Sequence, residues 1–252
     1  FIFLFFTFDF MNKIICLWSC PRNVSTALMY SFAQRKDTKV YDEVLYAHYL
    51  LESGLEHPGR KDILNSLEND GNKVIENIIL KKQDGISFHK LMTHFLININ
   101  TSFLDKVINI IFIRDPKDII NSYSKVIPNP SINDIGIKKQ YELYLHLEKK
   151  ENLPIVLDSK YLLQNPELVL KKLCLLINIL FDTNMLKWEN KARKEDGVWA
   201  KHWYKNVHNS QGFLPYTKKQ ITLYGRNLKL QKECEKYYNF LTKKSIKYDT
   251  RI

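Results

Sequence analysis

The sequence predicts an α/β fold, a three-layer domain in which a parallel β-sheet carries helices on both faces. Two observations lead to this expectation. Short runs of consecutive apolar residues recur along the chain, and such runs are typical of strands that are buried on both faces. Segments with helical spacing of apolar residues alternate with these runs, which builds βαβ units around a parallel sheet. A single domain is expected, because the sequence has no repeat and no linker rich in Gly and Ser.

Five segments have strand character. Three are strongly apolar and two are weaker: residues 14–18, 108–113 and 154–157, then 39–42 and 86–90. Helices are expected around Ala27, Leu28, Ser31 and Phe32, at residues 118–126 with Pro116 at the start, and from Asn165-Pro166 onward. A helical insertion is expected at residues 54–85 and a helical C-terminus from about residue 218. Ligands of such sheets bind beyond the carboxyl ends of the strands, so polar residues there are the candidates for function.

The composition narrows the range of partners. The 252 residues include 38 Lys and Arg against 27 Asp and Glu, a formal net charge of +11. A basic excess suits a polyanionic partner such as a nucleotide. The positive residues are scattered rather than gathered in one stripe, which argues against nucleic acid. The four cysteines, at positions 16, 20, 174 and 234, lack Cys-x-x-Cys spacing, so we expect buried thiols in a reducing, cytoplasmic compartment.

The first ten residues form a separate feature. Residues 1–10 are almost entirely apolar, lack the charged leader and cleavage site of a signal peptide, and are too short to span a bilayer. Met11 directly precedes the first strand. We therefore interpret residues 1–10 as translated upstream sequence and residues 11–252 as a single domain without a membrane span. The alternative, a truncated membrane anchor, would leave almost no stem before the first strand.

The junction after the first strand has the composition of a phosphate-binding loop. It comprises Cys20, Pro21, Arg22, Asn23, Val24, Ser25 and Thr26. A short turn from a strand into a helix directs free backbone N–H groups at one point, and the helix N-terminus adds partial positive charge. Arg22, Ser25 and Thr26 add side-chain donors. The loop is not a Walker A motif, because Gly-x-x-x-x-Gly-Lys-Ser/Thr is absent, and an ordinary strand-to-helix turn is the alternative interpretation.

A second polar segment follows the strongly apolar run in the middle of the chain. Arg114 lies at the carboxyl end of this strand, and Ser122 lies eight residues beyond it. A cation at a buried strand end either holds an anion or pairs with an acid at the rim of the sheet. Asp115 and Asp118 are the alternative partners, and such an exposed ion pair stabilises a fold little.

Together these two segments resemble the donor-binding motifs of sulfotransferases that use 3′-phosphoadenosine 5′-phosphosulfate (PAPS). In that family the first loop wraps the 5′-phosphosulfate, and an Arg and a Ser with the same separation bind the 3′-phosphate. The resemblance implies the first role for residues 20–26 and the second for Arg114 and Ser122. It extends from about residue 14 to 215, because residues 156–167 and 193–203 also match in order. A P-loop-like nucleotide-binding topology is implied.

The chain departs from the family pattern at three positions. Arg22 stands where cytosolic members have Lys, and it keeps the charge while adding a planar fork of donors. Val24 stands where they have Gly, which narrows the loop. In the late segment Glu195 replaces a Gly. The resemblance places this segment near the 3′-phosphate and assigns a contact there to Arg193 and Lys194.

Two further resemblances supply candidate catalytic residues besides Arg22. Residues 42–48 resemble the Glu-Pro-Leu-Tyr-His segment of carbohydrate sulfotransferases, which implies that Glu43 is the general base. An acid that stabilises a helix N-terminus is the alternative role for Glu43. The Lys-Thr-His run of cytosolic members implies that Lys90 assists the leaving group and that His94, two residues later than in the family, is a rival base. Without the resemblance, His94 is interpreted as a helix-start or core histidine.

The sequence thus predicts transfer of a sulfuryl group from PAPS to a hydroxyl or amine of a small-molecule or carbohydrate acceptor. The co-product is 3′-phosphoadenosine 5′-phosphate (PAP), and residues 54–85 and 127–137 are expected to shape the acceptor pocket. No metal is expected, since no residues have ligand spacing, and Trp199, Trp203 and Tyr204 are expected to cover the pocket or close the core. A P-loop kinase or NTPase and a non-catalytic nucleotide- or polyanion-binding module are the alternatives. No oligomeric state is predicted.

Overall fold

The computed structural model describes residues 12–218 and 220–247. At its centre is a five-stranded sheet in which neighbouring strands run parallel, in the order β2-β3-β1-β4-β5. The strands are β1 (Lys13–Ser19), β2 (Thr38–Asp42), β3 (Ile86–Met92), β4 (Ile108–Ile113) and β5 (Ile155–Asp158). All five predicted strands are present, and the predicted parallel α/β fold is confirmed. The interpretation of residues 1–10 as upstream sequence concerns residues outside the described ones.

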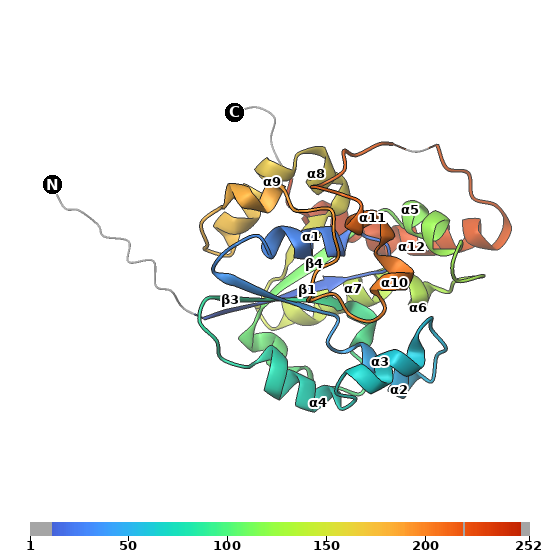
Figure 1. Cartoon of the computed structure of the whole chain (residues 1–252). Helices are drawn as coiled ribbons and strands as arrows, with labels where there is room; N and C mark the ends of the chain where they lie inside the picture. Colours follow the sequence, from blue (N-terminus) through green and yellow to red (C-terminus); the bar gives the residue numbers. More distant parts are fainter. Residues whose placement is uncertain (1–11, 219, 248–252) are drawn as a thin grey trace.

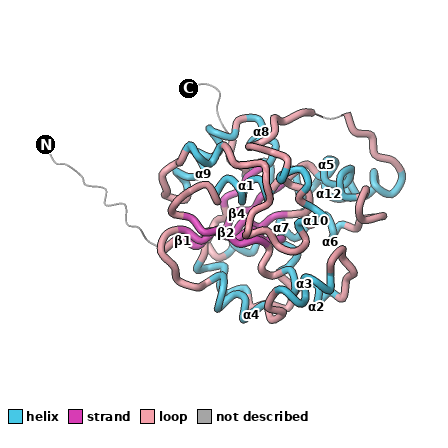
Figure 2. Tube along the Cα trace, in the orientation of Figure 1, coloured by secondary structure: helices cyan, strands magenta, loops and turns pink. Residues whose placement is uncertain are grey.

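Helices lie on both faces of the sheet, as predicted (Figure 1). Above it in Figure 1 lie α1 (Ser25–Phe32), α8 (Ser159–Gln164) and α9 (Pro166–Leu176), and below it lie α2 (Tyr46–Ser53), α3 (Arg60–Ser66) and α4 (Gly71–Val74). The other helices are α5 (Pro116–Tyr123), α6 (Ile132–Ile135), α7 (Ile137–Lys149), α10 (Ala200–Trp203), α11 (Lys205–His208) and α12 (Gly225–Lys244). The long helix α12 packs against α5 and α7. Figure 2 shows the strands at the centre of a shell of helices and loops.

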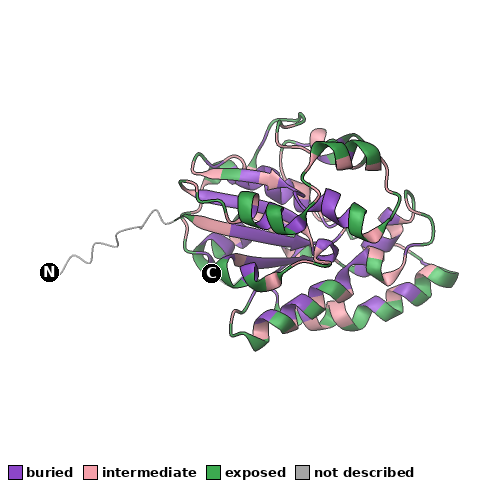
Figure 3. Cartoon of the chain, turned by 90° about the horizontal axis from the view of Figure 1, so that it is seen from below, coloured by how far each residue is buried: buried purple, intermediate pink, exposed green. Residues whose placement is uncertain are grey.

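The core fills the space between the sheet and its helices, and the strands are its most buried part (Figure 3). Several buried polar groups within it pair with one another. The indole nitrogen of Trp18 on β1 donates to Oδ1 of Asn109 on β4 at 2.8 Å. Gln140 of α7 donates to the carbonyl groups of Trp18 and Phe112 at 3.0 and 2.7 Å. These bonds fix the ends of the two central strands, from which the predicted loops begin. All four cysteines are buried, as expected.

The helix predicted after the strand at residues 108–113 begins at Pro116, as expected, but ends at Tyr123, three residues before the expected residue 126. It is α5, whose first residue is Pro116. The side chain of Asp115 caps it by accepting a hydrogen bond from the backbone N–H of Lys117 at 2.8 Å. A capping acid followed by proline is a strong start signal, which is why the beginning of this helix could be predicted from the sequence.

The predicted insertion and C-terminal helix also differ in detail from the structure. The predicted helical insertion at residues 54–85 contains two short helices, α3 and α4, and a π-helical turn, Ile75–Ile79. The C-terminal helix α12 begins at Gly225, not near residue 218. Residues 214–218 instead form a loop that lines the cavity described below. Short 3-10 helices lie at Thr93–Phe95, Thr101–Lys106 and Thr183–Leu186.

The parallel arrangement brings the carboxyl ends of all five strands to one edge. Ser19, Asp42, Met92, Ile113 and Asp158 are the last residues of the strands there. The first loop, Glu43, His94 and Arg114 all follow directly on these ends, so one edge of the sheet gathers the predicted site. Of the helices that the structure describes, none combines the length and apolarity that crossing a bilayer requires.

Candidate functional site

A cavity of about 1020 Å³ lies at the carboxyl edge of the sheet. Its size is at the upper end of the roughly 300–1,000 Å³ of typical ligand pockets, enough for a nucleotide and a second molecule. The predicted site residues that line it are Pro21, Arg22, Asn23, Val24, Ser25, Thr26, Glu43, Lys90, His94, Arg114 and Ser122. The first loop, after the central strand β1, divides this lining. We call the part next to Arg114 the β4 side, and the part next to Lys90 the β3 side.

The first loop is fastened from within by Asn23. The buried amide of Asn23 donates to the carbonyl of Phe112, near the end of β4, at 2.5 Å. Its Oδ1 accepts from the hydroxyl of Ser19 at 2.9 Å and from the backbone N–H of Ser25 at 3.2 Å. Arg114 adds a bond from outside the loop, by donating to the carbonyl of Arg22 at 2.6 Å. The loop is therefore tied to β1, β4 and α1 at once, and its conformation is set before any ligand binds.

Two residues of this loop have a left-handed backbone. The φ angle is 59° at Arg22 and 72° at Val24. This conformation costs an L-residue about 1–2 kcal/mol, and it is uncommon for a β-branched side chain. Val24 occupies the position at which the resembling family has Gly, so the loop keeps a shape that Gly adopts freely. Strained backbone of this kind persists where the surroundings hold it, and the bonds of Asn23 provide that support here.

Arg22 and Arg114 make the β4 side of the cavity cationic. Arg22 donates through Nε to the hydroxyl of Ser122 at 3.1 Å. Arg114 donates to Oδ2 of Asp118 at 3.3 and 3.4 Å, so the expected pairing with a rim acid also forms. Arg114 and Ser122, the two residues predicted to bind the 3′-phosphate, therefore both contact Arg22. Burial lowers the pKa of Arg22, and the nearby positive charge of the Arg114 guanidinium lowers it further.

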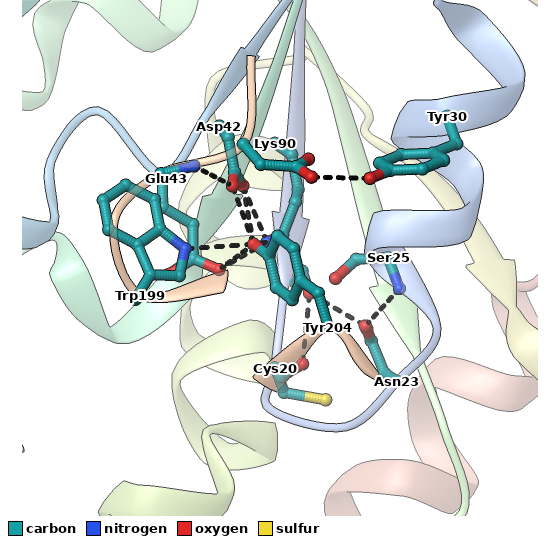
Figure 4. A network of polar contacts seen from close by, with 12 residues as sticks. Cys20, Asn23, Ser25, Tyr30, Asp42, Glu43, Lys90, Trp199 and Tyr204 are labelled. Atoms are coloured by element: carbon teal, nitrogen blue, oxygen red, sulfur yellow. Dashed lines mark hydrogen bonds and ion pairs between the residues drawn. The ribbon is translucent and has the colours of Figure 1, made fainter. Parts of the chain in front are cut away.

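Lys90 is the centre of a buried network on the β3 side (Figure 4). Its side chain is 1% exposed, and its ammonium group donates to Oδ1 of Asp42 at 2.8 Å, to the hydroxyl of Tyr204 at 2.5 Å and to Oε1 of Glu43. The register of β2 and β3 pairs Asp42 with Lys90, and paired residues of neighbouring strands point to the same face. Trp199 donates through its indole nitrogen to the Tyr204 hydroxyl at 3.0 Å. The register of the sheet thus places Lys90 beside Asp42, and Trp199 and Tyr204 of the late segment cover the pair.

The network holds one cation and two carboxylates. Burial by itself lowers the pKa of Lys90, but the charges of Asp42 and Glu43 outweigh it, so the pKa is raised and the ammonium stays protonated. Burial raises the pKa of Glu43 more than Lys90 lowers it, and the charge of Asp42 adds to the rise. Glu43 also has a left-handed backbone, with φ 43°, and its N–H donates to the carbonyl of Lys90 at 2.8 Å. Glu43 is therefore tied to the end of β3.

His94 lines the same side of the cavity but has the surroundings of a core histidine. Its ring packs edge-on against Tyr49 and Phe95. Its Nδ1 has no hydrogen-bond partner among the described residues. Burial lowers the pKa of His94 to about 3, so the ring is neutral at physiological pH. A neutral imidazole can accept a proton, but one with this pKa is a weak base.

Three predicted site residues lie away from the cavity lining formed by the described chain. Cys20 is fully buried, and burial raises the pKa of its thiol to about 12. Arg193 donates through Nε to Glu195 at 3.1 Å and lies over the ring of Tyr30. Lys194 is exposed. Glu195, the residue that departs from the family pattern, therefore already neutralises Arg193, and a 3′-phosphate contact by Arg193 and Lys194 stays a prediction.

Two members of the Lys90 network were not predicted as site residues, Asp42 and Tyr204. A signal for Asp42 is present in the sequence, because a buried lysine at a strand end needs a counter-ion and Asp42 ends the neighbouring strand. Tyr204 is separated from Lys90 by 114 positions, and no local pattern connects the two. Within the residues that the structure describes, no group of three or more potential ligands could hold a metal ion. The expectation of no metal remains a prediction.

Comparison with known proteins identifies the family. The family model described as a sulfotransferase domain matches residues 12–231. The chain belongs to this sulfotransferase family. Among solved structures, the sulfotransferase domain from the curacin biosynthetic pathway superposes with a TM-score of 0.53 at 15% identity, over 89% of this chain and 98% of that one. The sulfotransferase domain from the Synechococcus PCC 7002 olefin synthase gives a TM-score of 0.52 at 17% identity, over 89% and 96%. At these identities the likeness establishes a shared fold.

Two curated proteins of Arabidopsis thaliana are similar in sequence to this sulfotransferase-family chain. Branched-chain-amino-acid aminotransferase-like protein 2 is 35% identical over 232 residues, which is 91% of this chain and 41% of that protein. Branched-chain-amino-acid aminotransferase-like protein 1 is 38% identical over 205 residues, 80% of this chain and 36% of that protein. The chain thus spans less than half the length of these curated relatives, whose names refer to likeness to an aminotransferase.

Proposed function

We propose that this protein transfers a sulfuryl group from PAPS to a hydroxyl or amine of an acceptor and releases PAP. One observation carries the proposal: the same cavity has both kinds of group that the reaction needs. The guanidinium groups of Arg22 and Arg114 line one side, and a protonated lysine, Lys90, lies beside the carboxylate of Glu43 on the other. Membership of the sulfotransferase family supports sulfuryl transfer as the reaction. The aminotransferase-like names of the relatives apply to proteins of which this chain matches less than half.

The β4 side is the proposed donor site. Arg114 and Ser122 would bind the 3′-phosphate, since a guanidinium fork and a hydroxyl both form charge-assisted hydrogen bonds to phosphate oxygens. The first loop would bind the 5′-phosphosulfate, with Arg22 as its side-chain cation and the N-terminus of α1 behind it. The lowered pKa of Arg22 supports this assignment, because an anion between the two guanidinium groups would relieve their repulsion.

Transfer would take place as an in-line displacement at sulfur. The acceptor oxygen or nitrogen forms a bond to sulfur while the bond from sulfur to the bridging oxygen of the donor breaks, and that oxygen keeps the electron pair. Lys90 would stabilise the negative charge that develops on the bridging oxygen, and Arg22 would stabilise the equatorial oxygens. Positioning and electrostatics supply most of the catalysis in reactions of this type.

Glu43 is the better candidate for the base that takes the acceptor's proton. A general base works best when its pKa lies near the working pH. The pKa of Glu43 is raised above its ordinary 4.5 toward that range, whereas burial lowers the pKa of His94 to about 3, away from it. The Glu43 side chain also contacts the lysine that would assist the leaving group. Proton removal by Glu43 and assistance to the leaving group by Lys90 would thus take place at two side chains that contact each other.

Labelled PAPS provides the test of this function. Incubation with a metabolite extract, followed by mass spectrometry, should yield sulfated products and PAP. With an acceptor found in this way, Glu43→Gln should lower the transfer rate by about 10²–10⁴-fold, because the amide cannot take a proton. PAP affinity should change little. The wild-type rate should fall as pH is lowered through the raised pKa of Glu43, since the protonated carboxyl is no longer a base, and Glu43→Gln should lose this dependence.

The controls separate the rival assignments. If Glu43→Gln keeps the wild-type rate and His94→Ala loses it, His94 is the base. Activity should survive excess EDTA, and turnover that requires magnesium would favour a kinase or NTPase. Thermal-shift measurements with PAP, ATP and an oligonucleotide should give the largest stabilisation with PAP, because a ligand that binds the folded state raises its stability according to its affinity. Preference for the oligonucleotide would favour a non-catalytic polyanion-binding module.

A further inference from the structure

The hydrogen bonds of Lys90 have a consequence for the timing of the proposed reaction. A lysine ammonium has three N–H donors and no acceptor. In this structure Asp42, Glu43 and Tyr204 accept all three. No N–H of Lys90 is therefore left for the bridging oxygen of a donor. One of the three partners has to release the ammonium before Lys90 can assist the leaving group.

Tyr204 and Asp42 are the partners that are fixed in place. The Tyr204 hydroxyl has one hydrogen, and its lone pairs accept from Lys90 and from the indole of Trp199, both of which can only donate. Its hydrogen therefore goes to a carboxylate, and the oxygens of Asp42 at 2.8 and 2.9 Å are closer than Oε1 of Glu43 at 3.4 Å. The backbone N–H of Gly197 adds a third donor to Asp42 at 3.3 Å. Asp42 is thus a buried, fully hydrogen-bonded counter-ion.

Glu43 differs from Asp42 in exposure and position. The Asp42 side chain is 0% exposed, whereas Glu43 is 7% exposed and lines the cavity. Of the two carboxylates, Glu43 is the one that an acceptor in the cavity can reach. Taking up a proton removes the negative charge of Glu43, and with it most of the attraction between Glu43 and Lys90.

We propose that Asp42 and Tyr204 are positioning residues that hold Lys90, and that proton transfer to Glu43 frees the third N–H of Lys90 for the leaving group. This inference rests on the proposed function. In the step, the acceptor's O–H or N–H bond breaks and its proton moves to the Glu43 carboxylate. The acceptor atom bonds to sulfur as the bond from sulfur to the bridging oxygen breaks. That oxygen keeps the electron pair and accepts the hydrogen bond that Glu43 has released.

Two variants that shift the pH dependence of kcat in opposite directions test the proposal. We call the fall of kcat at low pH its acid limb. Asp42→Asn removes a negative charge that, together with burial, raises the pKa of Glu43, so the acid limb should move to lower pH. Tyr204→Phe removes a donor to Asp42, so Asp42 draws Lys90 away from Glu43 and the acid limb should move to higher pH. In both variants the plateau of kcat should fall about 10- to 100-fold, since a bond to a charged group is lost, while PAP affinity stays nearly constant.

Tyr144→Phe is the matched control. Its buried phenol donates to Glu148 at 3.2 Å on α7, outside the cavity lining, so kcat and its acid limb should remain as in the wild type. The proposal is overturned if Asp42→Asn and Tyr204→Phe lower kcat and leave the acid limb in place, as a merely structural role would do. Should Asp42→Asn fail to fold, the shift in Tyr204→Phe decides.

The same shifts can be followed without turnover. Carboxyl-carbon NMR titration of Glu43 in wild type, Asp42→Asn and Tyr204→Phe should give pKa changes of the same signs as the kinetic limbs. Unchanged titration of Glu43 overturns the network. A wild-type protein that transfers nothing from PAPS and does not bind PAP contradicts the proposed function instead, and leaves the titration as an independent measure of the network.

Discussion

The two cationic parts of the cavity differ in how their charge is balanced. On the β4 side Arg22 and Arg114 lie close together, and Asp118 contacts Arg114 only at 3.3–3.4 Å. On the β3 side Lys90 is buried against two carboxylates. The β4 side has two guanidinium groups and one nearby carboxylate, so a bound anion would balance its charge. The β3 side has one carboxylate more than it has cations, so it is completed by a proton. On the proposed function, the first region would bind the donor, and the second would respond to the proton that the reaction releases.

Of the changes considered, removal of Lys90 should have the largest effect on stability and activity. Lys90→Met keeps much of the side-chain volume but leaves Asp42 and Glu43 together in a buried site without a cation. Breaking a buried ion pair by removing one partner costs about 3–5 kcal/mol of unfolding free energy. We expect a loss of this size in denaturant titration at neutral pH, together with loss of transfer activity.

Lys139→Met is the matched control for this experiment. Lys139 pairs with Glu142 at 3.2 Å on α7, and both side chains are 45% exposed. An exposed ion pair contributes less than about 1 kcal/mol, so the stability should change little. Equal losses in the two variants would contradict the view that the Lys90 network is buried and tightly coupled.

Removal of Arg114 should affect binding rather than stability. Arg114→Ala loses a charge-assisted bond to the 3′-phosphate, worth about 1.5–3 kcal/mol, so PAP should bind roughly 10- to 100-fold more weakly. AMP, which lacks the 3′-phosphate, should bind almost as before. Isothermal titration of both nucleotides gives the comparison, and Arg226→Ala, an exposed change outside the cavity lining, should alter neither. Equal losses for PAP and AMP would place Arg114 at the 5′ end of the donor or in the fold.

Relief of the strained loop should have the smallest effect. Val24→Gly removes about 1–2 kcal/mol of left-handed strain and adds about 0.5–1 kcal/mol of chain entropy to be lost on folding. We expect a net stabilisation of at most about 1 kcal/mol, seen as a small rise in Tm, with PAP affinity retained. Asn129→Gly is the control, since Asn at φ 55° tolerates this conformation and should gain less. A clear loss of stability in Val24→Gly would show that the packing of Val24 against the core outweighs its strain.

The fold was predictable because its signals are local. Each apolar run that forms a strand is contiguous, and burial on both faces leaves no room for polar residues within it. The segments after these strands were predictable for the same reason: the first loop, Glu43 and Arg114 each follow directly on a strand end, and parallel strands bring those ends together. Helix boundaries without such a start signal were less predictable: α5 ends at Tyr123 rather than near residue 126, and α12 begins at Gly225 rather than near residue 218.

The Lys90 network was only half predictable because its contacts are tertiary. Asp42 comes from the register of two neighbouring strands, which the order of elements does not fix. Tyr204 arrives from a late loop, and its place depends on the packing of Trp199 and on the path of the whole segment. The contact between Glu195 and Arg193 could not be predicted either, because it depends on the local path of a loop without regular structure.

The pairing of Asp42 with Lys90 has a consequence for how this protein can change in evolution. The two residues are neighbours through backbone hydrogen bonds between β2 and β3, although the chain between them makes a long excursion through α2, α3 and α4. That excursion brings His57 to the cavity wall. Insertions, deletions and substitutions in it can remodel the wall while the register of the sheet keeps the ion pair intact. If the proposed function holds, acceptor preference and chemistry are encoded in separable parts of the chain, and the first can diverge while the second stays constant.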